Sequence, residues 1–503
     1  MPPGAERGTS VEVTTLGDAP NWPVQIWSDH SGIHWEALKE KGKFRVTVEP
    51  TVPIGTHHVR FFDSDNATDA MPFAVGRNEE SLEKEPNDRL KDAQVAAKSP
   101  QLFNGLLEKR GDVDTYAVDL KEGEHLIADI DAQQVLRSPL DASLQVLSDR
   151  GVVLAQNLDA HGLDPWLDFV APRDGRYFVR VFGFPETPDS TISFAGGETM
   201  CYRLAVARGG WLLAVRPMAV SSLFETKLEL AGLGIPAGID SYTVPVIPAS
   251  SSGMQAPYPL VIDGVANTLY LPVLAMPLVN EQPAADNLQT VTLPTSLTGV
   301  LDRPAQIDRF RFEAKKESKL RFALHSRDLG SSMDGVLRIL DEAGKQLARE
   351  DDTQKIADPT LTWQPPTAGH FVLEVSDAFG AGGDAWRYRV DIEPVVADVR
   401  LLVKTDHYQG KIGQPVEMIV TVERRDGFDQ ELQIAVEGLP DFVVCPVVVS
   451  EKMGPSAKEV RLMLTSSAAI QNPFRIVAKA SAIQRTAVTS ADALVSDLWL
   501  TIK

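Results

Sequence analysis

The sequence has very little cysteine and no long apolar run. Cys201 and Cys445 are its only cysteines and lie far apart in the chain, so no disulfide framework is expected. The longest apolar candidate, residues 269–279, is shorter than the ~20 residues that a membrane helix needs, and Pro272 and Pro277 interrupt it. A membrane span is therefore not expected. The redox compartment stays open, because many secreted bacterial proteins lack disulfides.

Positive charge is also scarce. Lys and Arg number 49 against 69 Asp and Glu, which gives a net charge of −20. Such a field repels phosphate backbones and anionic lipid. Nucleic acid and membrane surfaces are therefore excluded as expected partners, whereas clustered carboxylates can attract cations such as Ca²⁺.

Local catalytic motifs are missing. The sequence contains no G-x-S-x-G, H-E-x-x-H, G-x-x-x-x-G-K-[ST] or C-x-x-C pattern. Residues 232–238 superficially resemble a dinucleotide loop, but the spacing is wrong and Pro236 interrupts it. His57 and His58 fall in an expected strand, where neighbours point to opposite faces and do not chelate one ion together. We therefore predict that the chain is not an enzyme.

The N-terminus, MPPGAERGTS, has no basic stretch and no apolar core, so it is not a signal peptide. It begins where a strand is expected to be under way already. We therefore expect an export leader to be missing from this chain.

An internal repeat sets the expected architecture, because 503 residues are too many for one core. Residues 105–207 align with residues 299–394 over nearly their full length. The offset is 194 at Asp114/Asp308 and again at Gly175/Gly369. A constant offset over this length indicates two copies of one unit.

Each copy has the pattern of short strands. Tyr177, Val179 and Val181 alternate with Phe178, Arg180 and Phe182, which is the period of two that predicts a half-buried strand. Gly151 and Gly344 sit between strand-like runs, where glycine permits the positive φ of a hairpin turn. Short strands at regular spacing predict an all-β antiparallel sandwich in each copy.

The flanking regions repeat more faintly, since 7–13 and 224–230 each look like the first strand of an immunoglobulin-like domain. The region after residue 396 alternates in the same way. We therefore predict five tandem β-sandwich domains, in which Ig-like domains at 1–78, 210–278 and 396–503 alternate with the two repeat copies at 79–209 and 279–395.

The first copy resembles a known family. Residues 83–88 (EKEPND), 104–105 (NG), 111–116 (GDVDTY), 138–141 (SPLD) and 174–177 (DGRY) resemble the bacterial pre-peptidase C-terminal domain. The second copy fits the family loosely. The whole layout is similar to large secreted multidomain proteins of planctomycete-type bacteria. This resemblance implies jelly-roll sandwiches, an extracytoplasmic location, and an association with secreted peptidases in some family members.

The resemblance also implies a calcium site at the junction before the first sandwich. The family's ligand pattern falls on Glu83, Glu85, Asn87, Asp88, Asp112 and Asp114. Ca²⁺ takes six to eight oxygen ligands, which these side chains can largely supply. The family's hydroxyl ligand has no match, because Leu106 and Leu107 stand at that place, and its collagen-reading aromatics cannot be placed. The alternative is an acidic, solvated linker.

The second copy is expected to bind calcium weakly or not at all. Its linker, 280–287, has lost a carboxylate, and Gln306 stands where Asp112 stands in the first copy. Only Asp308 remains of the downstream acidic pair. The predicted cofactor is therefore Ca²⁺ in copy 1 only.

A second acidic cluster is present in both copies. Asp159, Asp164 and Asp168 correspond to Asp352, Asp358 and Thr362. They can form another cation site, or they can be turn-forming aspartates that hydrogen-bond their own backbone. The second interpretation is favoured.

Three functions remain open. The first is a non-catalytic extracellular binding, adhesion or scaffold protein, monomeric, with an unidentified protein or polysaccharide partner. The second is the accessory region of a secreted peptidase whose catalytic domain is absent. The third is an enzyme whose site is assembled between domains without a local motif.

Overall fold

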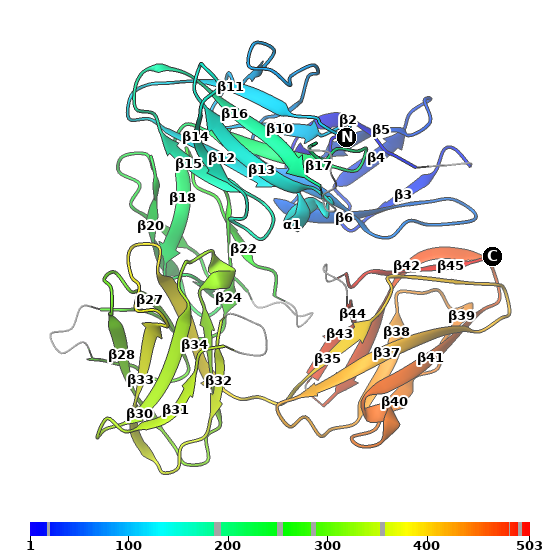
Figure 1. Cartoon of the computed structure of the whole chain (residues 1–503). Helices are drawn as coiled ribbons and strands as arrows, with labels where there is room; N and C mark the ends of the chain where they lie inside the picture. Colours follow the sequence, from blue (N-terminus) through cyan, green and yellow to red (C-terminus); the bar gives the residue numbers. More distant parts are fainter. Residues whose placement is uncertain are drawn as a thin grey trace. The chain divides into compact units, whose positions relative to one another are not determined.

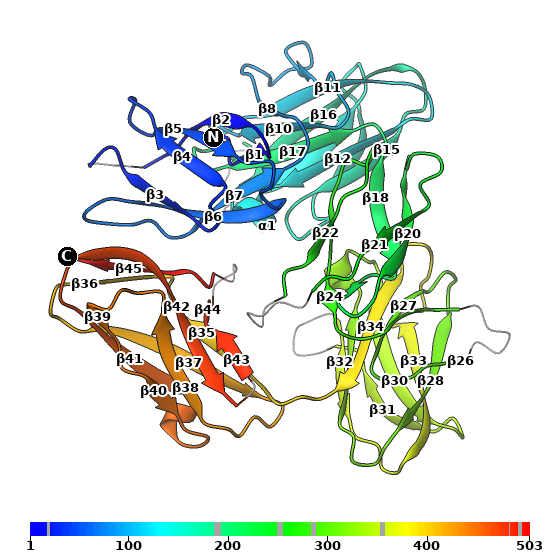
Figure 2. The same ribbon diagram turned by 180° about the vertical axis from the view of Figure 1, so that it is seen from behind.

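The structure is a computed structural model that describes residues 1–17, 21–185, 193–248, 255–282, 288–352, 358–481, 483–490 and 495–503. It is built almost entirely of β-strands (Figures 1 and 2). The described residues hold only three short helices, namely α1 (Gln133–Leu136) and the 3₁₀ turns η1 (Arg327–Leu329) and η2 (Pro455–Ala457). The predicted fold class, all-β with tandem sandwiches, is confirmed.

Residues 4–76 form two sheets, with strand orders β1-β7-β6-β3 and β2-β5-β4. Their strands are β1 (Gly4–Glu6), β2 (Ser10–Thr14), β3 (Gln25–Ser28), β4 (Ile33–Ala37), β5 (Lys43–Val48), β6 (Gly55–Phe62) and β7 (Met71–Gly76).

The next two sheets form what we call the first sandwich. Their orders are β15-β12-β17-β10-β8 and β14-β13-β16-β11-β9. Their strands are β8 (Glu80–Leu82), β9 (Gln94–Val95), β10 (Gln101–Leu106), β11 (Asp114–Leu120), β12 (His125–Asp131), β13 (Asp141–Leu147), β14 (Val153–Asn157), β15 (Trp166–Val170), β16 (Gly175–Phe184) and β17 (Cys201–Ala207).

Residues 211–274 form smaller sheets, ordered β18-β20-β21, β19-β24 and β22-β23. Their strands are β18 (Trp211–Arg216), β19 (Val220–Ser221), β20 (Thr226–Leu233), β21 (Ser241–Val244), β22 (Tyr258–Leu260), β23 (Leu269–Leu271) and β24 (Val273–Leu274).

The second sandwich has the sheet orders β25-β27-β34-β29-β32 and β26-β28-β33-β30-β31. Strand for strand, this is the topology of the first sandwich. Its strands are β25 (Leu278–Asn280), β26 (Leu288–Thr290), β27 (Thr295–Val300), β28 (Ile307–Ala314), β29 (Leu320–His325), β30 (Gly335–Asp341), β31 (Gln346–Glu350), β32 (Thr360–Trp363), β33 (Gly369–Asp377) and β34 (Arg387–Pro394).

The last region has sheets ordered β39-β41-β37-β35-β44 and β36-β45-β42-β38-β40, with β43 beside β42. Its strands are β35 (Asp398–Val403), β36 (His407–Gly410), β37 (Val416–Arg425), β38 (Leu432–Glu437), β39 (Val443–Val444), β40 (Val448–Ser450), β41 (Glu459–Ser466), β42 (Ile470–Ala480), β43 (Ile483–Thr486), β44 (Val488–Thr489) and β45 (Leu498–Ile502).

By compactness the chain divides into two units. The first comprises Met1–Trp211, Gly264–Ala266 and Asp398–Lys503, and the second comprises Leu212–Asp263 and Asn267–Ala397. Each sandwich lies wholly within one unit. The finer division into five domains stays a prediction.

The sandwich cores follow the period of two. Tyr177, Val179 and Val181 of β16 lie in the core between the two sheets of the first sandwich, and Phe178 lies on the outer face. Gly151 and Gly344 join β13 to β14 and β30 to β31 with φ of 77° and 83°. These are the left-handed values that a hairpin glycine adopts without strain.

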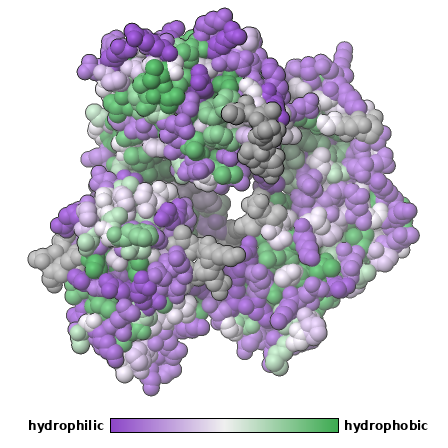
Figure 3. All heavy atoms as spheres, viewed as in Figure 1, coloured by the Kyte–Doolittle hydropathy of each residue, from purple (hydrophilic) through white to green (hydrophobic). Residues whose placement is uncertain are grey.

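The surface of the face shown in Figure 3 mixes hydrophilic and hydrophobic side chains. Both cysteines are free. Among the described residues, no helix is long and apolar enough to cross a membrane.

Candidate cation site

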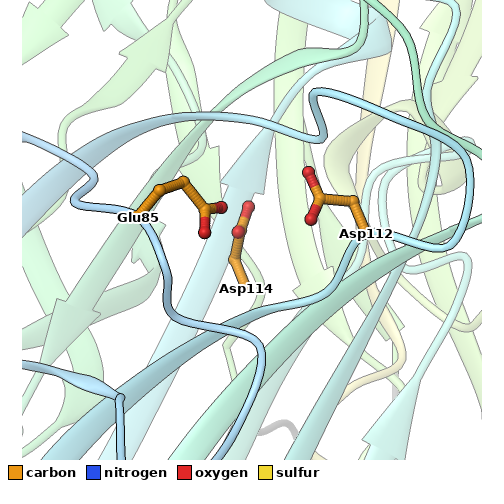
Figure 4. Close-up of side chains that lie close together, drawn as sticks. All are labelled: Glu85, Asp112 and Asp114. Atoms are coloured by element: carbon orange, nitrogen blue, oxygen red, sulfur yellow. The ribbon is translucent and has the colours of Figure 1, made fainter.

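Three carboxylates meet where the chain enters the first sandwich. Glu85 lies in the loop between β8 and β9, Asp112 in the loop before β11, and Asp114 is the first residue of β11. Each offers an oxygen within 4.8 Å of the others, and the three carboxylates face one another in Figure 4. This group can hold a metal ion, because hard cations prefer carboxylate oxygens.

A buried tyrosine fixes the orientation of Asp114. The Tyr202 hydroxyl of β17 donates to Asp114 Oδ2 at 2.5 Å, and the Tyr116 hydroxyl lies 2.7 Å from that of Tyr202. The ring of Tyr202 fits only because residue 105, opposite it on β10, is glycine: a Cβ there would lie 2.1 Å from Tyr202 Cζ. Asp114 Oδ1 is thereby left to face the group.

Glu83 lies directly behind Asp114. Its Oε1 accepts the Leu106 amide at 2.7 Å, and its carboxyl hydrogen-bonds Asp114. Burial, and then the charge of Asp114, raise the pKa of Glu83 far above its usual range. Burial also raises the pKa of Asp114. Burial thus opposes the ionisation of both carboxyl groups, and a nearby positive charge would favour it.

Several buried atoms at the site have no protein partner. Asn87 is fully buried, yet neither its Oδ1 nor its Nδ2 has a hydrogen-bond partner, and the same holds for Asp112 Oδ1 and Asp114 Oδ1. The backbone N–H of Asn87 donates to Glu85 Oε2 at 3.0 Å, which ties the two loop residues together. Buried polar atoms are nearly always paired, so these oxygens are available to a ligand.

Asp88 differs from the other predicted residues. Its side chain is exposed, and only its carbonyl oxygen is engaged, by the Thr115 hydroxyl at 3.5 Å. The group of three carboxylates therefore excludes Asp88. Whether the predicted residues bind a cation stays a prediction.

The second sandwich fills the equivalent space with an amide. Gln306 Nε2 donates to Asp308 Oδ1 at 2.8 Å, and Tyr388 donates to Asp308 Oδ2 at 2.6 Å. Asp308 therefore has both oxygens satisfied, whereas its counterpart Asp114 has one. Glu281 accepts the Val300 amide as Glu83 accepts that of Leu106. Glu281 is therefore the linker carboxylate that the second copy keeps.

One glutamine in each copy closes the entry loop. Gln94 accepts the Lys84 amide at 2.9 Å and donates to the Leu82 carbonyl at 3.1 Å. Gln289 makes the same two bonds with Gln282 and Asn280. The loop is three residues longer in the first copy.

The longer loop covers an apolar face. Leu90 and Ala93 pack against Ala117, Leu147 and Phe178 on the outer face of the β11–β16–β13 sheet. In the second sandwich this face is charged instead. There Arg309 and Arg338 contact Glu374 at 2.8 and 2.9 Å, and Arg311, which replaces Ala117, pairs with Glu342.

The second acidic cluster is structural where it is described. Asp164 accepts the backbone amides of residues 132–134 at 2.8–3.2 Å and so holds the start of α1. Asp358 does the same for residues 326–328 at η1. Asp168 contacts His125 at 2.8 Å. Asp164 and Asp358 thus accept backbone hydrogen bonds, but from amides 30 to 32 residues earlier in the chain and not from their own turns, as the favoured interpretation had it.

His57 and His58 both approach one carboxylate. His57 Nδ1 lies 3.0 Å from Asp29 Oδ1, and His58 Nδ1 lies 3.5 Å from Asp29 Oδ2. Asp29, which follows β3, therefore lies within reach of both rings, and the expectation that the two histidines do not chelate one ion together stays untested. His57 Nε2 also contacts the Pro53 carbonyl at 2.8 Å.

A surface hollow of about 340 Å³ lies beside β40, lined by Glu431, Gln433, Val449, Lys479, Ala480 and Ser481. Lys479 is ion-paired with Glu437 at 2.7 Å.

The comparisons with known proteins give partial matches. No model of a known protein family matches the chain. A probable subtilase-type serine protease of Deinococcus radiodurans is 34% identical over 83 residues, which is 16% of this chain and 11% of that protein. The chain thus spans only about a tenth of this relative's length.

Solved structures similar to the chain include β-sandwich proteins. The pre-peptidase C-terminal domain of a Bacillus anthracis collagenase covers 22% of this chain and 98% of its own, with 12% identity and a TM-score of 0.18. The four N-terminal Ig domains of Dscam1 cover 99% of this chain and 96% of their own, with 9% identity and a TM-score of 0.19. The residues of the site, and not these alignments, carry the proposal below.

Proposed function

We propose that the chain is a non-catalytic extracellular binding or scaffold protein whose first sandwich binds Ca²⁺ where the chain enters it. One observation carries the calcium site. Asp114 Oδ1, Asp112 Oδ1 and Asn87 Oδ1 are buried without a partner beside Glu85, whereas the second copy satisfies the corresponding aspartate with Gln306.

The ligand set favours calcium over smaller ions. Glu85, Asp112 and Asp114 supply carboxylates, with Glu83 behind Asp114, and Asn87 supplies an amide oxygen, all from loops or strand ends. Ca²⁺ accepts such irregular shells of oxygen ligands, whereas Mg²⁺ demands near-octahedral geometry. Asp88 belongs to the family pattern, but its side chain is exposed, and its backbone carbonyl accepts a hydrogen bond from the Thr115 hydroxyl.

The ion orders the entry loop. Glu85 and Asn87 come from the loop, and Asp112 and Asp114 from the sandwich, so one ion joins the two. Ligand binding to the folded state alone stabilises it by about 2.7 kcal/mol at a hundredfold excess over the dissociation constant.

The test is thermal unfolding of the full chain in chelator and in a calcium series. Wild type should gain stability with calcium, and Asp112→Asn should lose most of this gain. Asp88→Asn is the matched control and should respond like wild type. An unchanged unfolding temperature in calcium would support the alternative interpretation, in which the segment is an acidic, solvated linker that binds no ion.

A second candidate function is the accessory region of a secreted peptidase. The 83-residue match to a subtilase-type protease favours it. Sequencing the coding region on both sides of this chain separates the two, since a neighbouring peptidase domain supports the accessory role. The same experiment tests the proposed extracytoplasmic location, which an upstream export signal supports.

The partner is proposed to be an extracellular protein or polysaccharide. Binding of the full chain to glycan and protein arrays, with and without calcium, tests this. Signals that vanish in chelator and with Asp112→Asn connect the partner to the first sandwich.

A further inference from the structure

Two carboxyl groups are in contact where the chain enters the second sandwich. Glu281 follows edge strand β25, and Asp308 lies at the start of β28. Their side chains line the same small hollow and hydrogen-bond each other. Two ionised carboxylates have no hydrogen between them to share, so a bond of this kind requires a proton on one of them.

Neutral donors occupy other oxygens of the pair. The Val300 amide donates to Glu281 Oε2 at 3.1 Å. Gln306 Nε2 and the Tyr388 hydroxyl donate to the two oxygens of Asp308 at 2.8 and 2.6 Å. None of these donors brings a positive charge.

The neighbouring positive charge offsets the repulsion only in part, because Arg216 lowers the pKa of Glu281 by less than burial and Asp308 raise it. Arg309 of β28 pairs with Glu374 at 2.8 Å, and Arg216 of β18 donates to the backbone carbonyl of Glu281 at 3.4 Å. Asp302, in the loop after β27, adds negative charge near Asp308. The hollow beside the pair measures about 10 Å³, which is room for about one water molecule.

We propose that a proton shared by Glu281 and Asp308 holds the entry strand on the second sandwich, in the place where the first sandwich uses a cation. The two copies of one unit then respond to different signals. The junction before the first sandwich responds to calcium, as proposed above. The junction before the second sandwich responds to pH.

The electrostatics agree with this geometry. Burial, followed by the charge of Asp308, raises the pKa of Glu281, and burial raises that of Asp308. The folded pair binds more protons than the unfolded chain, so its contribution is complete below the usual glutamate pKa of about 4.5 and falls as the pH rises through the folded pKa. Both carboxylates are then charged, and β25 separates from β27.

Amide hydrogen exchange of the full chain in chelator, from about pH 5 to about pH 9, tests the proposal when rates are divided by the intrinsic rate at each pH. The readouts are the Val300 amide, which donates to Glu281, and the Glu281 amide, which donates to Thr298 at 2.7 Å. Their protection should fall by up to about tenfold per pH unit in wild type. Core amides of β33 should not change.

Glu281→Gln supplies the hydrogen permanently, because its amide can donate to Asp308 without titrating. Protection in this variant should equal that of wild type at low pH and stay flat. Glu313→Gln, at an exposed position of β28, is the control and should keep the wild-type profile. A flat wild-type profile, or a Glu281→Gln profile that still falls with pH, overturns the proposal. Because chelator is present throughout, either outcome is independent of calcium binding at the first sandwich.

Discussion

The Tyr202 hydroxyl and Asp114 Oδ2 form a 2.5 Å hydrogen bond inside the first sandwich, while Asp114 Oδ1 is buried with no protein partner. The two oxygens of this carboxylate therefore have different roles. One oxygen is held by the protein, and the other is presented to the group formed with Glu85 and Asp112. Tyr202 is therefore a positioning residue for the proposed ion.

Tyr202→Phe should weaken calcium binding by about tenfold or more, because second-sphere partners that orient ligands typically contribute 10- to 100-fold. Calorimetric titration of the full chain measures the affinity. Tyr177→Phe, which removes a hydroxyl that contacts the Arg173 carbonyl elsewhere in the same sandwich, should leave the affinity unchanged. Equal affinities for the two variants would show that Tyr202 only fills space.

Gln306→Asp should make the second sandwich responsive to calcium. The new carboxylate would join Glu281 and Asp308, and like charges destabilise one another by about 1–3 kcal/mol without a cation. In an Asp112→Asn background, which silences the first site, unfolding should occur earlier in chelator and recover in calcium. Gln306→Asn is the control and should show no such recovery.

Leu90→Ala should destabilise the first sandwich by about 1–2 kcal/mol, since the side chain is only partly buried against Phe178, Ala117 and Leu147. Urea unfolding measures the loss. The matched variant Leu163→Ala removes an exposed leucine of the same sandwich and should cost far less. Equal losses would contradict the covering role of the entry loop.

His57 should make residues 4–76 less stable at high pH. Burial lowers the pKa of His57, but hydrogen bonds to Asp29 and the Pro53 carbonyl outweigh this and raise it above the usual 6.5. The stabilisation is thus complete below about pH 6.5 and is lost as the pH rises through the folded pKa. Exchange of the His58 amide, which donates to Asp29 Oδ2 at 2.7 Å, reports the loss.

His57→Gln should remove this pH dependence, while His34→Gln should not. His34 contacts Glu49 at 2.9 Å with both side chains at least half exposed, so solvent screens that pair. A His58 amide that exchanges with the same corrected rate at all pH values would refute the role of His57.

The fold was predictable because its signals are local. Alternation at Tyr177, Val179 and Val181 shows which side of β16 faces the core, and Gly151 marks the hairpin. The repeat offset likewise placed Asp114 and Asp308 at equivalent positions, and both begin the strands that bear the site. The alternation of apolar residues and the spacing of turn glycines can be recognised in the sequence because each depends on residues close together in the chain.

The site was predictable only in part, because its remaining contacts are distant in sequence. Tyr202 lies 88 residues after Asp114. The sequence feature that could have revealed it is that Tyr202 and Tyr388 occupy equivalent positions in the two copies. Each lies opposite a glycine in the neighbouring strand. No feature of the sequence indicates that the Asp88 side chain is exposed, since a carboxylate in a proline-containing loop can point toward the site or toward solvent.

The bonds of Gln94 and Gln289 have a consequence for how such modules diversify. Each side chain joins the two ends of its entry loop, so the interior of the loop can lengthen or shorten without moving the strands that flank it. Loop closure costs little more for a few added residues. Because the glutamine holds both ends of the loop, one copy can gain ligand residues inside its loop and the other copy can lose them. The strand order of the two sandwiches stays the same.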